Sequence, residues 1–378
     1  MTRLLWLIDS FNVGGAESLV VPFVRNHDRS RYRLSVACLT SIGGNPIEAE
    51  VMREGVAVTN LGARNLRDLA AFRRLTRLIR DERIELIHAH LTYASTWAAL
   101  VSRLTGVPMI ATLHVAPPAG GREGLRDRLM RFVLNRWARR VILVSAALRA
   151  QYVAGRGLDP RRAVVVHNGI DVARFRRDAA GARRRLEREL AVPEGARIAV
   201  TVSVLRPGKG IEVLLAAIPA VVERVPGAVF LIVGDGPKRE EWQALADATG
   251  EARQVRWAGH RRDVDAIVAG CDLFVLPTLA DAFPTVLLEA MAAGLPVVAS
   301  AVGGVPEIVQ ADVTGTLVPP ADADALAAAI IHHLLDRDGA GRMGVAAVLA
   351  AESLFSTAAW IGRLDAVYGE VSREARRR

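Results

Sequence analysis

Two carboxylates eight residues apart stand in a stretch that is otherwise apolar. The stretch reads DAFPTVLLEAMAAGLPVVAS from Asp281 to Ser300, and its second carboxylate is Glu289. We expect a helix from about Val286 to Ala293, because Thr285 can cap its start and Gly294 can end it. The free backbone N–H groups at such a start suit a phosphate. Glu289 lies among apolar neighbours and needs hydrogen-bond donors, which either ribose hydroxyls or a nearby backbone N–H could supply.

Two glycine-containing loops in the second half could hold a nucleotide. The sequence LRPGKG places Arg206 and Lys209 three residues apart in a loop before a helical pattern. Two cations with exposed backbone N–H groups suit a diphosphate, and the alternative is a solvated turn. The sequence VGDGP contains Gly234 and Gly236, which could let a nucleotide lie close to the backbone. Arg239 stands where a dinucleotide fingerprint has a small residue, so nicotinamide binding is disfavoured.

Glycines and histidines mark the first half. The sequence NVGGAES reads as a glycine turn that opens a helix, either to approach a phosphate or sugar or only to turn tightly. His88 and His90 follow one apolar run, and His114 follows the next. We expect His114, and secondarily His90, to contact substrate; the alternative is that these histidines are structural. Their spacing does not indicate a metal site.

These candidates follow apolar runs, which defines the fold that must position them. Runs such as RLLWLI and PMIATLH in the first half, and AVFLIVG and LFVLPT in the second, alternate with amphipathic stretches. This alternation predicts two doubly wound α/β domains with parallel sheets. We expect domains at 1–170 and 171–357, and a helix at 358–378 that returns to the first domain. Ligands bind beyond the carboxyl ends of parallel strands, so the candidates should line a cleft between the domains.

Composition narrows the classes of protein. Hydrophobic residues make up 51% of the 378 residues, yet no apolar run is long and uninterrupted enough for a membrane span. Leu4 to Ile8 is too short a run for a secretory signal. Cys38 and Cys271 are expected to be core residues in a reducing, cytoplasmic compartment. The net charge of +9 is concentrated before Ile170, which suggests nucleic acid, an anionic membrane, or only solvated helix faces.

A basic amphipathic helix is predicted within residues 122–140. Arginines surround an apolar set at helical spacing: Leu125, Leu129, Phe132, Val133 and Trp137. Such a helix can lie on an anionic membrane, which suggests a lipid-linked acceptor, or its apolar stripe can pack on the sheet. Nucleic-acid binding is disfavoured because aromatic residues are only 5% of the chain and do not alternate with basic ones.

Taken together, these motifs resemble the retaining family 4 glycosyltransferases of the GT-B fold. The resemblance spans nearly the whole chain and rests on GGAE at 14–17, HAH at 88–90, His114, HNGID at 167–171, LRPGKG at 205–210, VGDGP at 233–237, the stretch at 281–300 and GGVPEIV at 303–309. It implies two Rossmann-like domains facing a central cleft. It also implies transfer of a sugar from a UDP- or GDP-linked donor to an acceptor, with retained configuration and without metal or other cofactor.

The resemblance assigns site residues by their matching positions. The expected catalytic residues are His114, Asp281, Arg206 and Lys209. The expected donor-binding residues are Gly15, Gly234, Gly236, Phe283, Pro284, Thr285, Val286, Leu287 and Glu289. The expected acceptor-binding residues are Gly14, Glu17 and His90. Asp281 replaces the usual Glu and is one methylene shorter, and Val204 stands where the family often has Arg, so Arg206 is expected to take over.

The implied partners are the nucleotide-sugar donor, a glycan or lipid-linked acceptor, and the anionic inner face of the membrane, with no nucleic acid. The process would be polysaccharide, glycolipid or cell-envelope glycan synthesis. Three rivals remain: an epimerase that converts the donor alone, a degenerate transferase that binds nucleotide without turnover, and a non-enzymatic nucleic-acid-binding protein.

Overall fold

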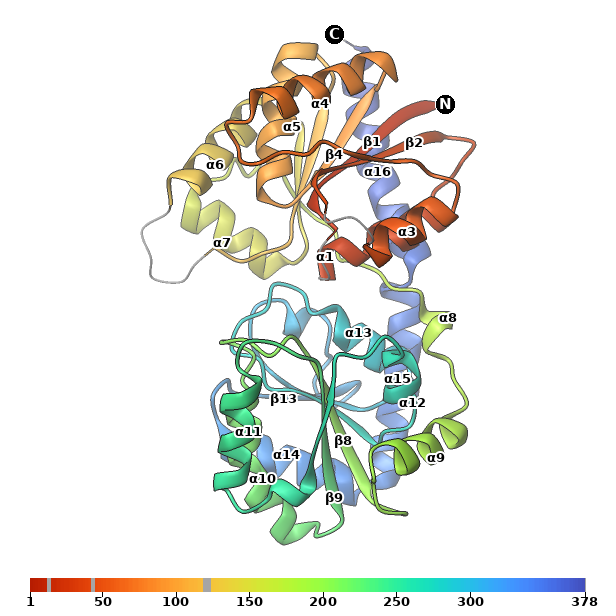
Figure 1. The fold of residues 1–378 in the computed structure, drawn as a ribbon, viewed down its shortest axis with the longest axis vertical. Coiled ribbons are helices and arrows are strands. Elements are labelled where there is room, and N and C mark those ends of the chain that lie inside the picture. Colours follow the sequence, from red (N-terminus) through yellow and green to blue (C-terminus); the bar gives the residue numbers. More distant parts are fainter. Residues whose placement is uncertain (12–14, 42–44, 118–123, 378) are drawn as a thin grey trace. The chain divides into compact units, whose positions relative to one another are not determined.

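The computed structural model describes residues 1–11, 15–41, 45–117 and 124–377. They form two compact units (Figure 1). The first unit comprises Met1–Gly169 together with the C-terminal segment from Thr357, and the second unit comprises Ile170–Ser356. Each unit is an α/β fold built on one parallel sheet, which confirms the expected fold class.

The sheet of the first unit contains seven strands in the described part of the chain. Its order is β3 (Val58–Asn60), β2 (Tyr32–Thr40), β1 (Thr2–Ser10), β4 (Leu86–His90), β5 (Met109–Leu113), β6 (Arg140–Leu143) and β7 (Ala163–Val165). All neighbouring strands are parallel. The chain order reverses between β1 and β4, and this switch point is where parallel sheets of this kind bind ligands.

Helices cover both faces of this sheet, which explains why its central strands are continuous apolar runs. Trp6 of β1 points to the face covered by α16, where it meets Trp360. Asp9 points to the opposite face, where α5 begins. The helices are α1 (Gly15–Ser18), α2 (Val20–Asn26), α3 (Pro46–Arg53), α4 (Leu69–Asp81), α5 (Thr92–Thr105), α6 (Leu125–Trp137), α7 (Ala146–Arg156) and α16 (Thr357–Arg376).

The second unit repeats the plan with six described strands. Its order is β10 (Val255–Gly259), β9 (Ala228–Val233), β8 (Arg197–Val202), β11 (Leu273–Leu276), β12 (Val297–Ser300) and β13 (Gly315–Val318). The helical segments are α8 (Val172–Phe175), α9 (Ala179–Glu189), α10 (Ile211–Arg224), α11 (Arg239–Ala248), α12 (Val264–Ala269), α13 (Thr285–Ala292), α14 (Ala323–Leu335) and α15 (Arg337–Leu354), with single 3₁₀ turns at Ala252–Gln254 and Val305–Glu307. The switch point lies between β8 and β11.

Local signals explain several element boundaries and buried positions. The carboxylate of Asp322 accepts a hydrogen bond from the Ala325 N–H and thereby caps the start of α14. Cys38 and Cys271 are buried free thiols, as expected for core residues. Among the described helices, none has the length and apolar character needed to cross a bilayer.

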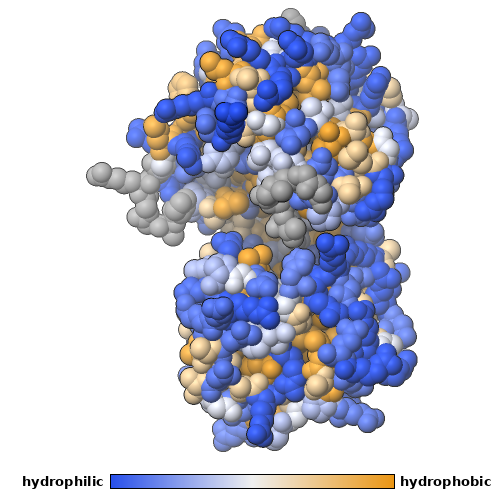
Figure 2. Space-filling view, in the orientation of Figure 1, coloured by the Kyte–Doolittle hydropathy of each residue, from blue (hydrophilic) through white to orange (hydrophobic). Residues whose placement is uncertain are grey.

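The face of the molecule drawn in Figure 2 is mostly hydrophilic, with hydrophobic side chains in separate patches. Helix α6 contributes exposed apolar residues to the surface: Leu125 is 80% exposed and Phe132 is 62% exposed, and Leu129 is also exposed. Val133 of the same helix is buried. The apolar set expected on this helix is therefore divided between the core and solvent.

Candidate active site

At the switch point of the second unit, two loops meet. The loop after β8 contains Arg206, Lys209 and Gly210, and the loop after β11 leads from Pro277 to α13. Gly210 has a positive φ of 68°, and a Cβ at this position would lie 1.8 Å from the carbonyl oxygen of Pro277. Only glycine fits this contact, which holds the cationic loop against the carboxyl end of β11.

This contact brings together two of the expected catalytic residues. Lys209 Nζ lies 2.7 Å from Asp281 Oδ2, and the two side chains are only 15% and 18% exposed. Asp281 Oδ1 also accepts a hydrogen bond from the Phe283 N–H at 3.3 Å. The carboxylate is thus fixed through both of its oxygens. Arg206, in contrast, is exposed on the same loop.

Helix α13 begins one residue earlier than expected. Its first residue is Thr285, and the position before it is occupied by Pro284 in an extended conformation. Pro284 occupies the capping position that was predicted for Thr285, and its side chain makes no capping hydrogen bond, so the predicted cap is wrong. The fixed φ of proline lets the helix start directly after it, which leaves the Thr285 hydroxyl inside the first turn. The start of the helix still lies at the end of the loop that carries Asp281, although the Leu287 N–H already donates to the Pro284 carbonyl oxygen at 3.1 Å.

Glu289 is a partly buried carboxyl in the second turn of α13. Burial raises its pKa to about 7, while the charge of Arg174 lowers it and that of Asp265 raises it. Asp265 is itself paired with Arg177 at 2.6 Å and with Arg174 at 3.7 Å. A carboxyl held in such an environment lacks solvation, which hydroxyl donors of a ligand could replace.

The glycines of the VGDGP loop, which are expected to bind the donor, pack closely against a neighbouring loop. Gly234 and Gly236 have positive φ values of 136° and 158°, and a Cβ on them would lie 1.8 Å from Ser203 O and 2.4 Å from Leu205 O. The close approach that they permit is therefore to the neighbouring loop after β8. By this packing they shape the loop that carries Lys209.

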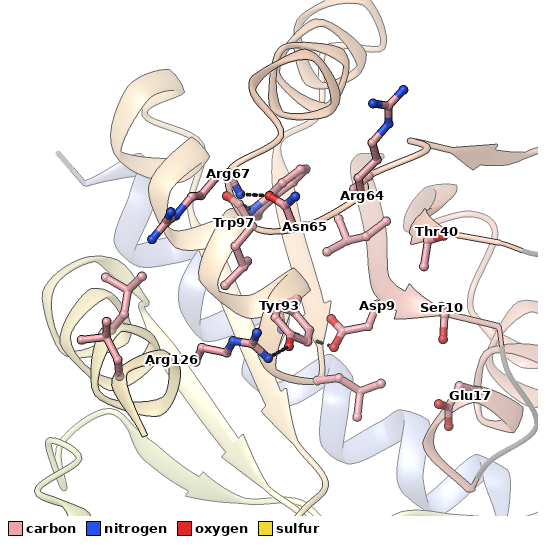
Figure 3. A pocket seen from close by; sticks show the side chains of 16 residues that line it. Asp9, Ser10, Glu17, Thr40, Arg64, Asn65, Arg67, Tyr93, Trp97 and Arg126 are labelled. Carbon is pink, nitrogen blue, oxygen red and sulfur yellow. Dashed lines mark hydrogen bonds between the residues drawn. The ribbon is translucent and has the colours of Figure 1, made fainter. Parts of the chain in front are cut away.

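The switch point of the first unit holds a pocket of about 950 Å³ (Figure 3). Asp9 lies at its inner side, where its Oδ1 accepts from the Ala94 N–H at 2.6 Å and its Oδ2 from the Tyr93 N–H at 3.3 Å. Burial raises the pKa of Asp9 to about 6, despite these two bonds. Glu17 also lines the pocket, and burial raises its pKa too.

Arginines line the outer part of the same pocket. Arg126 of α6 donates to the Tyr93 hydroxyl at 2.5 Å, and its guanidinium lies 5.6 Å from the centre of that ring. Arg67 extends toward the same side of the pocket as Arg126, whereas the guanidinium of Arg64 points away from Asp9 (Figure 3). The pocket therefore combines carboxylates with cations, an arrangement that can bind a hydroxylated molecule bearing an anionic group.

Most of these lining residues were absent from the sequence-based candidates. Asp9 closes an apolar run in the same way as the other candidates and could have been found by that rule. The arginines carry no such signal, because Arg64 and Arg67 lie in an irregular loop and Arg126 in a helix. Of the expected first-unit residues, Glu17 lies in the pocket, Gly15 begins α1, and Gly14 lies outside the described residues.

The histidines lie on the opposite face of the first sheet from the pocket. His90 is only 1% exposed and its ring stacks on Trp6, with ring centres 3.8 Å apart. The expectation that His90 touches an acceptor is therefore wrong for this structure, because side-chain alternation along β4 turns it into the core. His90 Nδ1 instead lies 3.1 Å from His114 Nε2. His114 is partly exposed, and burial lowers its pKa to about 4.

Comparisons with known proteins agree with this architecture. The family model described as Glycosyltransferase Family 4 matches residues 13–174, and the model described as Glycosyl transferases group 1 matches residues 182–348. A crystal structure of Anabaena Alr3699/HepE in complex with UDP-glucose superposes with a TM-score of 0.86 at 22% identity, covering 98% of this chain and 100% of that one.

Two curated relatives are more similar in sequence. A GDP-mannose-dependent alpha-(1-6)-phosphatidylinositol monomannoside mannosyltransferase of Mycobacterium tuberculosis is 38% identical over 187 residues, which are 47% of this chain and 48% of the relative, so the match spans about half of that protein. A D-inositol 3-phosphate glycosyltransferase of Corynebacterium efficiens is 31% identical over 305 residues, covering 76% of this chain and 72% of the relative. The chain thus belongs to the family 4 glycosyltransferases and has their GT-B fold.

Proposed function

We propose that the protein transfers a sugar from a nucleoside diphosphate sugar to an acceptor, with retention of the anomeric configuration. The observation that carries this proposal is the pairing of Lys209 with Asp281 beside the start of α13, at the switch point of the second sheet. The UDP- and GDP-linked donors named for the similar proteins support a donor of this class.

In the proposed reaction the bond between the anomeric carbon and the diphosphate oxygen breaks, and a bond to an acceptor oxygen forms. Lys209 and Arg206, with the N–H groups at the start of α13, stabilise the charge that develops on the leaving diphosphate. The acceptor proton passes to that diphosphate on the same face of the sugar. We propose that these cations supply the stabilisation without a metal. Glu289 accepts hydrogen bonds from ribose hydroxyls, and Asp281 from a sugar hydroxyl once Lys209 turns to the diphosphate.

The pocket of the first unit is the proposed acceptor site. Asp9 and Glu17 are placed to accept hydrogen bonds from hydroxyl groups, and Arg67 and Arg126 to pair with an anionic substituent. This mixture favours a phosphorylated or otherwise anionic polyol over a neutral glycan. The inositol-containing acceptors in the names of the two curated relatives are consistent with that choice.

We further propose that α6 brings the protein to the anionic, cytoplasmic face of a membrane. Leu125, Leu129 and Phe132 form an exposed stripe at helical spacing, with arginines around it. A Leu129→Ser/Phe132→Ser variant should sediment with anionic liposomes at least about threefold less than the unchanged protein. The control is a Leu349→Ser variant, which removes an exposed leucine of α15. Equal sedimentation of the unchanged protein with anionic and neutral liposomes would contradict the proposal.

Incubation with a panel of UDP-, GDP-, ADP- and dTDP-sugars, with and without inositol phosphates, tests the function. Mass spectrometry should detect a glycosylated acceptor with one donor, and NMR should show an anomeric configuration equal to that of the donor. Lys209→Met should lower the rate by about 100-fold. Arg224→Met, at the far end of α10, should leave it unchanged. A new sugar nucleotide formed from the donor alone would instead indicate an epimerase.

A further inference from the structure

Three histidines share one face of the first sheet and make unequal hydrogen bonds. His88 and His90 are two residues apart on β4, and His114 follows β5, so their side chains point to the face covered by α16. Both ring nitrogens of His88 are occupied: Nδ1 lies 2.6 Å from the hydroxyl oxygen of Tyr368, and Nε2 lies 2.7 Å from Thr112 Oγ1. His88 is therefore fully satisfied as a core residue.

His90 is satisfied at only one nitrogen. Its Nδ1 faces His114 Nε2 at 3.1 Å, and its Nε2 is buried without a hydrogen-bond partner among the residues that the structure describes. A hydrogen bond between two imidazoles requires a proton on one of the facing nitrogens and a lone pair on the other. The pair can thus exist in two arrangements, which differ in the ring that donates.

The unpartnered Nε2 of His90 indicates which of the two histidines donates the hydrogen bond. If His114 donated, a neutral His90 would carry its own proton on Nε2, which would leave a buried N–H without an acceptor. If His90 donates from Nδ1, its Nε2 carries only a lone pair. Unpaired buried N–H groups are rarer in proteins than acceptors with an unused lone pair, so the second arrangement is favoured.

We propose that His90 is a positioning residue that fixes His114 as the tautomer protonated on Nδ1. His114 then accepts at Nε2 from His90 and offers its Nδ1–H to an oxygen of the bound substrate. In catalysis this inference rests on the proposed sugar transfer, in which a neutral N–H donor would orient a sugar hydroxyl. The tautomer itself is a property of the free protein and can be tested without turnover.

The surroundings of His90 and His114 keep both imidazole rings neutral, and this hydrogen bond requires a neutral His114 that can accept at Nε2. Burial lowers the pKa of His90 well below its ordinary value, and the nearby His88 and His114 lower it further. Burial also lowers the pKa of His114 to about 4. Stacking on Trp6, at an angle of 18° between the rings, fixes the plane of His90 and therefore the direction of its Nδ1–H.

Two substitutions of His90 separate hydrogen bonding from packing. His90→Phe keeps an aromatic ring on Trp6 but removes the N–H, whereas His90→Asn loses the ring but places an amide N–H near the former Nδ1. The experiment records ring-nitrogen NMR spectra of ¹⁵N-histidine-labelled full-length protein for both variants, alongside donor KM and kcat. Circular dichroism melting of each variant establishes that it is folded.

The expected wild-type spectrum shows His114 protonated on Nδ1 and unprotonated on Nε2. His90→Phe should change that pattern of protonation. It should also lower kcat roughly tenfold, the equivalent of one lost hydrogen bond, while the donor KM should stay within about twofold of the wild-type value. His90→Asn should retain both the pattern and most of kcat. A proton on His114 Nε2 in the wild-type protein would overturn the proposal. A wild-type kcat in His90→Phe together with a reduced kcat in His90→Asn would overturn it as well. If the wild-type protein transferred no sugar, the proposed function would be refuted. The NMR spectrum would still establish which nitrogen of His114 carries the proton.

Discussion

Replacing Glu289 by Gln should stabilise the second unit at alkaline pH, although it should weaken nucleotide binding. The carboxyl lies partly buried in α13, and burial is the largest cause of its raised pKa. Glutamine has nearly the same shape but carries no charge at any pH. The variant therefore removes the free-energy penalty of a buried negative charge, and also removes the carboxylate that we propose binds ribose.

The size of the effect follows from the shift in pKa. The folded-state pKa of Glu289 is about 7, against an ordinary value of 4.5. Below the ordinary value, the folded and unfolded forms both hold the proton, and the carboxyl costs nothing. Between the two values only the unfolded form releases it, so the free energy of unfolding falls as pH rises. The penalty reaches about 3 kcal/mol above pH 7, and about 2.5 kcal/mol of it develops between pH 5 and pH 8.

Differential scanning calorimetry at pH 5 and pH 8 measures this difference. Glu289→Gln should raise the melting temperature of the second unit by about 5–10 °C more at pH 8 than at pH 5. Glu240→Gln, which changes an exposed glutamate of α11, serves as the control and should show no such pH dependence. An equal effect of Glu289→Gln at both pH values would refute the reasoning, because it would mean that the folded protein does not disfavour the ionised carboxyl.

Three further predictions concern the loops and the pocket. Lys209→Met and Asp281→Asn should each destabilise the second unit by about 1–2 kcal/mol in urea, and the double variant by about 1 kcal/mol less than their sum; additive losses would contradict a direct ion pair. Gly210→Ala should cost about 3–4 kcal/mol because its methyl group meets a backbone carbonyl, whereas Gly208→Ala, with positive φ but open space, should cost about 1–2 kcal/mol; similar losses would show that the close contact is absent. Since burial raises the pKa of Asp9 to about 6, Asp9→Asn should stabilise the first unit more at pH 7.5 than at pH 4, as measured by calorimetry; no difference would argue that Asp9 is well solvated.

The proximity of the loops that carry Lys209 and Asp281 could be predicted from the sequence, because each loop directly follows an apolar strand. Strand ends in a parallel sheet share one edge, so the loops that carry Lys209 and Asp281 were expected near each other. The structure places their charged atoms in contact. The isolated carboxyl of Glu289 likewise marked an unusual position, since a charge among apolar helix residues requires partners.

The features that the sequence did not reveal depend on side-chain direction and on contacts between distant segments. Thr285 looked like a helix cap, but Pro284 before it already sets the extended conformation and starts the helix one residue earlier. His90 looked accessible because it ends a strand, yet strand alternation points it onto Trp6. Arg67 lines the pocket because the loop after β3 is hydrogen-bonded to β2 and to Trp97 of α5, which no local pattern indicates.

A calorimetric titration of the full-length protein with UDP, GDP and ADP tests the central claim most directly. We predict that one diphosphate binds with a Kd below about 1 mM, and that Lys209→Met weakens this binding by about tenfold or more, equivalent to about 1.4 kcal/mol of a charge-assisted contact. Arg224→Met should bind as the unchanged protein does. Absence of binding by any of the three diphosphates, or equal binding by Lys209→Met, would contradict the assignment of the second unit's switch point as the donor site.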